Sequence, residues 1–272
     1  MTAMSSAAPK AFLRWAGSKR QVLPLIEDHF RSGSFERYIE PFAGSACLFF
    51  SIAPKQAILG DINGELMLMY RTIKKAPTEV LAELKGRRRS RAEFLRMRSI
   101  EPRSLVASSR AARFIYLNRF CFNGLYRTNQ RGQFNVPFGA TKTGTLPKRS
   151  ALLACSKALQ RVRLITGDFE KVLRHAKRGD FIYMDPPYAV GSRRVFNEYD
   201  SRNFSSKEVK RVRRGMERLD RRGVKFVVTY ADSPEAELLR KGFSSSTISV
   251  RRNIAGFASR RRYANEVLIW NQ

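Results

Sequence analysis

Short apolar runs alternate with amphipathic stretches along most of this chain. Turn-forming residues bound the runs, and the stretches between them place apolar residues roughly every three or four positions. This alternation is typical of a parallel sheet whose strands are joined by crossover helices. It predicts strands near 37–39, 56–59, 162–165, 181–184, 224–229, 247–250 and 266–270, and helices that begin near 46 and span 65–75, 169–176, 206–219 and 234–240.

One long stretch interrupts the alternation. From about residue 76 to 161 the pattern is helical and basic, and then rich in Asn, Gly and aromatic residues. We therefore predict an α/β domain formed by residues 11–75 and 162–272, an inserted, mainly helical domain at 76–161, and a disordered tail at 1–10.

The charge of the chain indicates a polyanionic partner. Lys and Arg total 52 against 23 Asp and Glu, which gives a net charge of +29. Such a field attracts nucleic acid and makes its binding strongly dependent on salt. A solvated basic surface, a membrane surface or an acidic protein partner are the alternatives. The excess runs through the whole chain, however, and this distribution favours a nucleic acid.

Other classes of protein are disfavoured by what the sequence lacks. Its 3 cysteines and 2 histidines show no metal-ligand or redox spacing, so we expect no metal and no disulfide framework. No apolar run approaches the ~20 residues that a membrane helix needs, so we expect no membrane contact. A chain of 272 residues is also too short to carry a full nuclease beside the α/β domain.

The sharpest local signal is the tetrapeptide Asp-Pro-Pro-Tyr at 185–188, directly after the apolar run at 181–184. Ligands bind at strand ends of this kind in doubly wound sheets. Because neither proline has an N–H, the loop offers hydrogen-bond acceptors and few donors. Asp185 and the Pro186 carbonyl could accept the two hydrogens of an exocyclic amine, and Tyr188 could stack on its ring. The alternative is a rigid turn, since Asp-Pro is a common turn pair.

A second candidate site lies in the turn from Glu40 to Gly44, between the first predicted strand and its helix. Glycine there lets the backbone approach a nucleoside closely. Asp61 ends the next strand, at a spacing from which an acid can bind ribose hydroxyls. The alternative for Asp61 is a helix N-cap. A dehydrogenase is disfavoured, because the Gly-x-Gly-x-x-Gly fingerprint is absent.

Taken together, these motifs resemble the Dam family of DNA adenine-N6 methyltransferases, in the order of that family and over most of the chain. The matching segments are 12–19 (N-terminal cofactor motif), 38–44 (glycine loop), 61–63 (ribose motif), 116–127 with 132–139 (recognition core), 167–169 and 185–188 (catalytic motif), and 265–269 (closing strand).

The resemblance implies a Rossmann-like methyltransferase sheet with an inserted target-recognition domain, S-adenosylmethionine as donor without a metal, and double-stranded DNA as partner. It implies a cytoplasmic, nucleoid-associated monomer that methylates N6 of an adenine flipped out of the duplex, within GATC. The catalytic residues would be Asp185, Pro186 and Tyr188. The cofactor-binding residues would be Trp15, Lys19, Glu40, Phe42, Gly44, Asp61, Asp168, Phe169 and Asp185. The DNA-binding residues would be Arg14, Phe122, Asn123, Leu125, Arg127, Asn129 and Pro137.

Some of these roles have structural alternatives, since Trp15 could belong to the core and Leu125 could be a packing residue. The chain also departs from the family at two positions. Many relatives have Gly-x-Gly where this chain has Gly44-Ser45-Ala46. Alanine adds a Cβ near the cofactor and disfavours a positive φ, so we expect an altered affinity for the cofactor. Ser18 stands where relatives often have glycine.

Two other functions remain open at this point. The same fold could methylate adenine in RNA, although the recognition core at 116–139 favours DNA. A catalytically silent DNA-binding protein is the second alternative, which the presence of Asp185, Lys19 and Asp61 disfavours.

Overall fold

The computed structural model describes residues 8–15, 17, 19, 22–139, 144–189, 204–251 and 263–271. In these residues a single seven-stranded sheet has the order β3-β2-β1-β4-β5-β7-β6. The strands are β1 (Arg37–Glu40), β2 (Ala57–Asp61), β3 (Val162–Thr166), β4 (Asp180–Met184), β5 (Lys225–Ala231), β6 (Ser244–Arg251) and β7 (Tyr263–Trp270). Strands β1 to β5 pair in parallel, while β7 is antiparallel to both β5 and β6.

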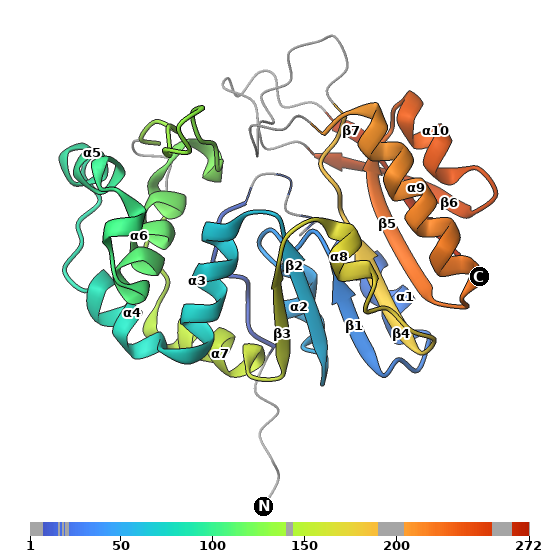
Figure 1. Ribbon diagram of the computed structural model, residues 1–272, viewed down its shortest axis with the longest axis horizontal. Coiled ribbons are helices and arrows are strands. Elements are labelled where there is room, and N and C mark those ends of the chain that lie inside the picture. The colour runs from blue at the N-terminus through green and yellow to red at the C-terminus, as the bar shows by residue number, and fades with distance from the viewer. Residues whose placement is uncertain are drawn as a thin grey trace, which may run out of the picture.

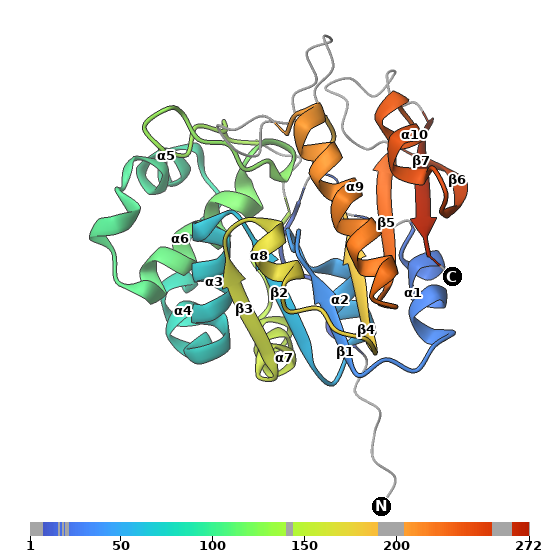
Figure 2. The same ribbon diagram turned by 45° about the vertical axis from the view of Figure 1, so that its right-hand side comes forward.

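Helices cover both faces of the sheet (Figure 1). One face packs against α1 (Leu23–Arg31), α2 (Cys47–Ile52) and α3 (Gly64–Lys75), and the other against α8 (Phe169–Leu173), α9 (Ser206–Arg221) and α10 (Pro234–Arg240). Figure 2 shows α9 in front of β4 and β5, with α1 and α2 behind the sheet. Successive residues of a strand point to opposite faces, so Tyr38 enters one core cluster and Ile39 the other.

The stretch between α3 and β3 is mainly helical and lies beside the β3 edge (Figure 1). It contains α4 (Pro77–Leu84), α5 (Arg91–Ser99), α6 (Ala107–Phe120) and α7 (Arg149–Leu159), with short 3-10 turns at Pro102–Ser104 and Phe122–Gly124. Its buried side chains, such as Phe94 and Ile115, belong to the same core cluster as Tyr38 of the sheet. The division of the chain into two domains therefore stays a prediction.

The predicted α/β fold is confirmed, and every predicted strand and helix has a counterpart close to its expected bounds. Two features were not predicted from the pattern. Helix α1, in which only Ile26 is fully buried, precedes the first strand, and the sheet ends in an antiparallel pair. Residues 1–7 of the tail predicted at 1–10 lie outside the described residues, as does Ser18. The arginines at 260–262, which add to the positive charge of the chain, lie outside them too. No helix in the described part of the chain has the length and apolar character needed to cross a membrane.

Candidate active site

The carboxyl ends of β1, β2, β3 and β4 lie at one edge of the sheet because these strands run in parallel. The strand order reverses between β1 and β4, which leaves a crevice at their carboxyl ends where ligands bind in open α/β sheets. Two candidate segments flank this point: the glycine loop follows β1, and the segment from Asp185 to Tyr188 follows β4. The sheet thus unites motifs that are far apart in the sequence.

Asp185 is held through one of its two carboxylate oxygens. Its Oδ1 lies 2.9 Å from Nζ of Lys19 and accepts a hydrogen bond of 2.9 Å from Oγ1 of Thr229 on β5. Oδ2 has no hydrogen bond or ion pair with any described residue. The carboxylate is therefore oriented by the protein while one oxygen stays available as an acceptor.

Lys19 is a buried cation whose side chain is 5% exposed. Its three N–H groups have three acceptors within 3.1 Å: the Gly17 carbonyl, the Tyr188 hydroxyl and Asp185. Burial alone would lower the pKa of Lys19, but Asp185, Tyr188 and Glu266 together raise it above its ordinary value. The ammonium group therefore stays charged at any pH at which the protein works.

Tyr188 is fixed at its hydroxyl and at its ring. The hydroxyl accepts from Lys19 and donates to Oε1 of Glu266 on β7 at 3.1 Å. The ring meets Tyr230 edge-on at a centroid distance of 5.2 Å. Burial raises the pKa of Tyr188 above its ordinary value, so the hydroxyl remains a neutral donor.

The Trp15 indole packs directly against Gly44 of the glycine loop. Gly44 has a φ of +47°, and a Cβ added to it would lie 2.8 Å from Nε1 of the indole. Its carbonyl accepts from the Tyr70 hydroxyl at 2.8 Å, and its N–H donates to Oδ2 of Asp61 at 3.0 Å. Glycine adopts this conformation without strain and leaves room for the indole, so the packing of Trp15 requires a residue without a Cβ here. Trp15 itself is partly buried against the core.

Asp61 is not the helix cap that its position allowed. The N-cap of α3 is Asn63, whose side chain accepts from the Leu66 N–H at 3.1 Å. Asp61 instead accepts from the N–H groups of Asn63 and Gly44. It therefore ties the end of β2 to the glycine loop that follows β1.

Ala46 departs from the backbone preference of alanine, while the expected change in cofactor affinity stays a prediction. This alanine adopts the left-handed conformation that glycine would favour, with φ of +50°. Its side chain is fully buried, and its N–H donates to the Ala43 carbonyl at the start of α2. Surrounding packing thus holds a conformation that costs a non-glycine residue about 1–2 kcal/mol.

Glu40, at the end of β1, is almost fully buried and accepts a hydrogen bond of 2.8 Å from the Tyr38 hydroxyl. Burial raises the pKa of Glu40 well above its ordinary value; the Tyr38 hydrogen bond opposes this shift, and Asp185 and Asp61 add to it. The predicted contact of Glu40 with the cofactor stays a prediction.

A second aromatic contact joins the glycine loop after β1 to the first residue of α8. Phe42 of the glycine loop stacks on Phe169 at a centroid distance of 5.1 Å. Asp168 caps α8 through its Oδ1, which accepts from the Glu170 N–H and from Nη2 of Arg211. Arg211 also binds Glu170 and Glu208 and lies 4.9 Å from the Phe169 ring centroid. Arg211 therefore ties α9 to Asp168 and Glu170 at the start of α8.

The N-terminal motif contacts the predicted recognition core directly. The backbone N–H of Arg14 donates to Oδ1 of Asn118 at 2.9 Å, and the Asn118 amide donates back to the Arg14 carbonyl. Gly124 is packed so tightly on Arg14 that a Cβ there would lie 2.8 Å from it. Tyr126 stacks on Trp15 at 6.3 Å. The predicted cofactor and DNA residues are therefore joined by side-chain and backbone contacts.

The remaining predicted DNA residues lie in the loops after α6. Phe122 is 42% exposed, and Asn123 beside it has a φ of +53°. The Arg127 Nε donates to Asn135 at 2.8 Å, and neither Nη group binds a described residue. The Asn129 side chain closes the turn to Gln133, Pro137 is exposed, and Leu125 packs partly on the core. Leu125 thus has, in part, the packing role that the sequence analysis gave as its alternative.

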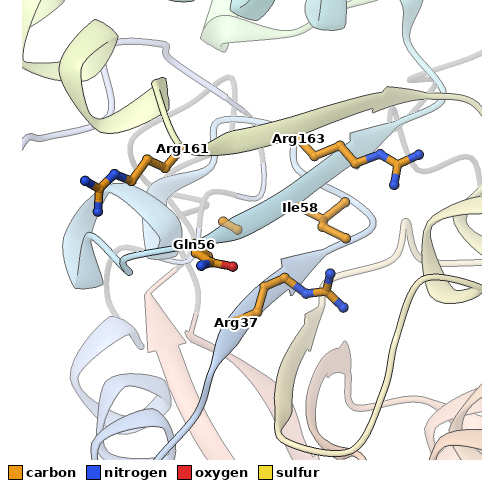
Figure 3. Close-up of a pocket in the computed structure, with 6 residues that line it drawn as sticks. Arg37, Gln56, Ile58, Arg161 and Arg163 are labelled. Carbon is orange, nitrogen blue, oxygen red and sulfur yellow. The ribbon is translucent and has the colours of Figure 1, made fainter.

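The open pocket in Figure 3 is not this site. It is lined by Arg37, Gln56, Ala57, Ile58, Arg161 and Arg163, which lie at the amino ends of β1, β2 and β3. Asp185 and the glycine loop follow carboxyl ends and therefore lie at the opposite edge of the sheet. No predicted site residue lines this pocket.

A family model for D12 class N6 adenine-specific DNA methyltransferases matches residues 15–254. The chain belongs to this family. A type II methyltransferase of Lactococcus lactis is 34% identical to it, over 96% of this chain and 95% of the relative. A type II methyltransferase of Methanocaldococcus jannaschii is 31% identical, over 96% and 99%. The DNA adenine methylase of Escherichia coli K12 is 30% identical, over 95% and 94%.

The methyltransferase has site residues that the sequence reasoning missed. Thr229 and Glu266 contact Asp185 and Tyr188 from β5 and β7, and Arg211 binds Asp168 from α9. A signal for the first two was present, because each is a polar residue that directly adjoins an apolar run of its strand, at 226–228 and at 267–270. Arg211 gave no such signal, since it lies in a helix with many arginines.

Proposed function

We propose that this methyltransferase transfers the methyl group of S-adenosylmethionine to N6 of an adenine flipped out of duplex DNA, within GATC. One observation carries the proposal. Asp185 lies at the switch point of the sheet with Oδ1 bound by protein donors and Oδ2 not bound by any described residue. A fixed acceptor of this kind suits a substrate that donates an N–H.

The residues around the crevice fit the donor molecule. Gly44 lets the backbone approach closely, Asp61 can accept from ribose hydroxyls, and Asp168 is 40% exposed with Oδ1 already anchored. Phe42 and Phe169 form an aromatic wall for an adenine ring. S-adenosylmethionine, when bound, supplies a methyl group on a positively charged sulfur, which needs no metal to be electrophilic.

Protein groups would perform the remaining tasks. Asp185 would accept one N–H of the adenine amine and the Pro186 carbonyl the other, which favours a pyramidal nitrogen and localises its lone pair. The neutral Tyr188 ring would stack on the base. These groups act by orientation and by preorganised acceptors rather than by a covalent intermediate.

Extruding the base costs on the order of a few kcal/mol. Phe122 suits the role of filling the gap, because it is a large apolar side chain exposed on a loop whose next residue has a left-handed conformation. The high positive charge of the chain would hold the duplex through its phosphates.

The test uses the purified chain, S-adenosylmethionine, a GATC duplex, its single-base variants, and an RNA of matching sequence. Mass spectrometry of nucleosides should show N6-methyladenine in the GATC duplex. We predict that Asp185→Ala abolishes transfer while folding is retained, because the amine loses its main acceptor. Asp185→Asn should keep residual activity, and Asp28→Ala, which removes an exposed carboxylate of α1, should behave as wild type.

Near-normal turnover by Asp185→Ala would overturn the catalytic assignment. Preferential methylation of the RNA would show that the substrate is an adenine in RNA and would overturn the proposal of a DNA substrate. Binding of DNA without any methyl transfer would favour a silent DNA-binding protein.

A further inference from the structure

A chain of buried hydroxyl groups ends on the carboxylate of Asp185. The Thr229 hydroxyl on β5 donates to Oδ1 at 2.9 Å, and the Tyr183 hydroxyl on β4 lies 2.9 Å from Thr229 Oγ1. Both hydroxyl-bearing residues are about 1% exposed. Water therefore cannot replace either donor.

The direction of the chain follows from counting hydrogens. A threonine hydroxyl has a single hydrogen, and an ionised carboxylate can only accept. The Thr229 hydrogen is therefore used on Asp185, so Tyr183 must donate to Thr229. Burial raises the pKa of Tyr183 well above its ordinary value, which keeps its hydrogen in place. The order of donation is Tyr183 to Thr229 to Asp185.

We propose that Thr229 is a positioning residue for methyl transfer: with Lys19 it fixes Oδ1 of Asp185, so that Oδ2 faces the substrate amine. The Tyr183 hydroxyl donates to the Thr229 hydroxyl and so holds it in the orientation that reaches Asp185. This inference rests on the proposed function, because it assigns a task to a residue that would not touch the base. The two restraints differ, since Lys19 stabilises the charge of the Asp185 carboxylate and Thr229, on a rigid strand, fixes the orientation of that carboxylate.

The register of the sheet explains why Thr229 can reach the carboxylate. Strands β4 and β5 pair in parallel with Met184 opposite Val228, so Asp185 and Thr229 are the next residues along the same pair. A hydroxyl at this position of β5 lies beside the first residue after β4. Such a contact is set by the backbone of two buried strands, which makes it insensitive to loop motion.

The test compares Thr229→Val, which removes the hydroxyl at nearly constant shape, with Thr229→Ser, which keeps it. We expect Thr229→Val to lower the single-turnover rate constant on the GATC duplex by about 10–100-fold, the range for losing a group that orients an active-site residue. Dissociation constants for DNA and S-adenosylmethionine should stay within about twofold, because neither ligand contacts Thr229 in this proposal. Thr229→Ser should recover the rate to within about threefold.

Thr72→Val is the matched control. Thr72 is also buried and its hydroxyl also has a protein partner, the Leu68 carbonyl, but it lies in α3. It should leave the rate unchanged. If Thr229→Val does not fold, Tyr183→Phe decides instead, with an expected loss of about 3–10-fold at unchanged affinities.

The outcomes separate this inference from the proposed function. Absence of methyl transfer by the wild-type protein would remove the proposed function. An active wild type with Thr229→Val at the same rate would overturn the inference alone. Equal losses in Thr229→Val and Thr229→Ser, or a loss that follows weaker cofactor binding, would show a packing role and also overturn it.

Discussion

The chain offers two lysine–carboxylate pairs of the same length in different surroundings. Lys19 lies 2.9 Å from Asp185 with its side chain 5% exposed, and Lys177 lies 2.9 Å from Glu36 with its side chain 61% exposed. The same substitution, Lys→Met, removes the ammonium from each while keeping a long apolar side chain. The comparison sets a buried ammonium with several acceptors against an exposed ammonium with one.

We predict that Lys19→Met lowers the free energy of unfolding by about 3–5 kcal/mol, because it leaves two partly buried carboxylates, Asp185 and Glu266, without their cation. Three hydrogen bonds end on this ammonium, and Glu266 lies a further 3.8 Å from it. Lys177→Met should cost at most about 1 kcal/mol, since water screens an exposed pair. For a chain of this size the first change lowers the melting temperature by roughly 6–15 °C.

Urea unfolding followed by circular dichroism measures both values. The difference between wild type and Lys19→Met should be the same at pH 7 and at pH 9. The pKa of Lys19 is raised in the folded protein, so its contribution is fully present below the unfolded value of about 10.4 and is lost only as the pH rises through the higher folded value. Equal costs for the two variants, or a loss of the difference by pH 9, would refute this reasoning.

Two further predictions concern the ligands. Gly44→Ala should weaken S-adenosylmethionine binding by at least about tenfold in calorimetry, because a left-handed alanine costs about 1–2 kcal/mol and its Cβ would lie 2.8 Å from the Trp15 indole; unchanged affinity would show that the indole can move aside freely. Arg127→Ala should relax the preference at one base of GATC by about 1–3 kcal/mol, because its two Nη groups can bind a guanine as a fork. If instead the methylation rates of all single-base variants of the duplex fall alike, Arg127 contacts phosphate.

Much of the fold followed from the sequence because the parallel strands are buried on both faces. Their apolar runs stand out, and the acids Asp61 and Asp185 follow them directly. Strands β6 and β7 were predicted, but their antiparallel direction was not, because the pattern of apolar positions does not show in which direction a strand runs. The conformation of Ala46 could not be predicted either, because the packing around α2 overrides the local preference of alanine.

The hydrogen-bond partners of the site residues could not be predicted from the sequence, because the fold brings together residues that are far apart in the chain. Lys19 and Tyr188 are separated by 169 positions and meet at 3.0 Å. The sequence predicted each residue through a motif but assigned Lys19 to the cofactor and Tyr188 to the base. Their contact shows that the two predicted sites share one hydrogen-bond network, so a change on one side will affect the other.

The carboxylates of this network also explain how a strongly basic protein can select a base from a polyanion. Arginines and lysines give the chain its charge of +29, which attracts phosphates. Asp185 follows the carboxyl end of β4, and its Oδ2 is not bound by any described residue, so its negative charge disfavours a phosphate that approaches it. Because Oδ1 of Asp185 is already bound to Lys19 and Thr229, the acceptor is oriented before any ligand arrives, and no binding energy is needed to order it. A neutral base edge that donates N–H groups is the part of a nucleotide that this arrangement admits.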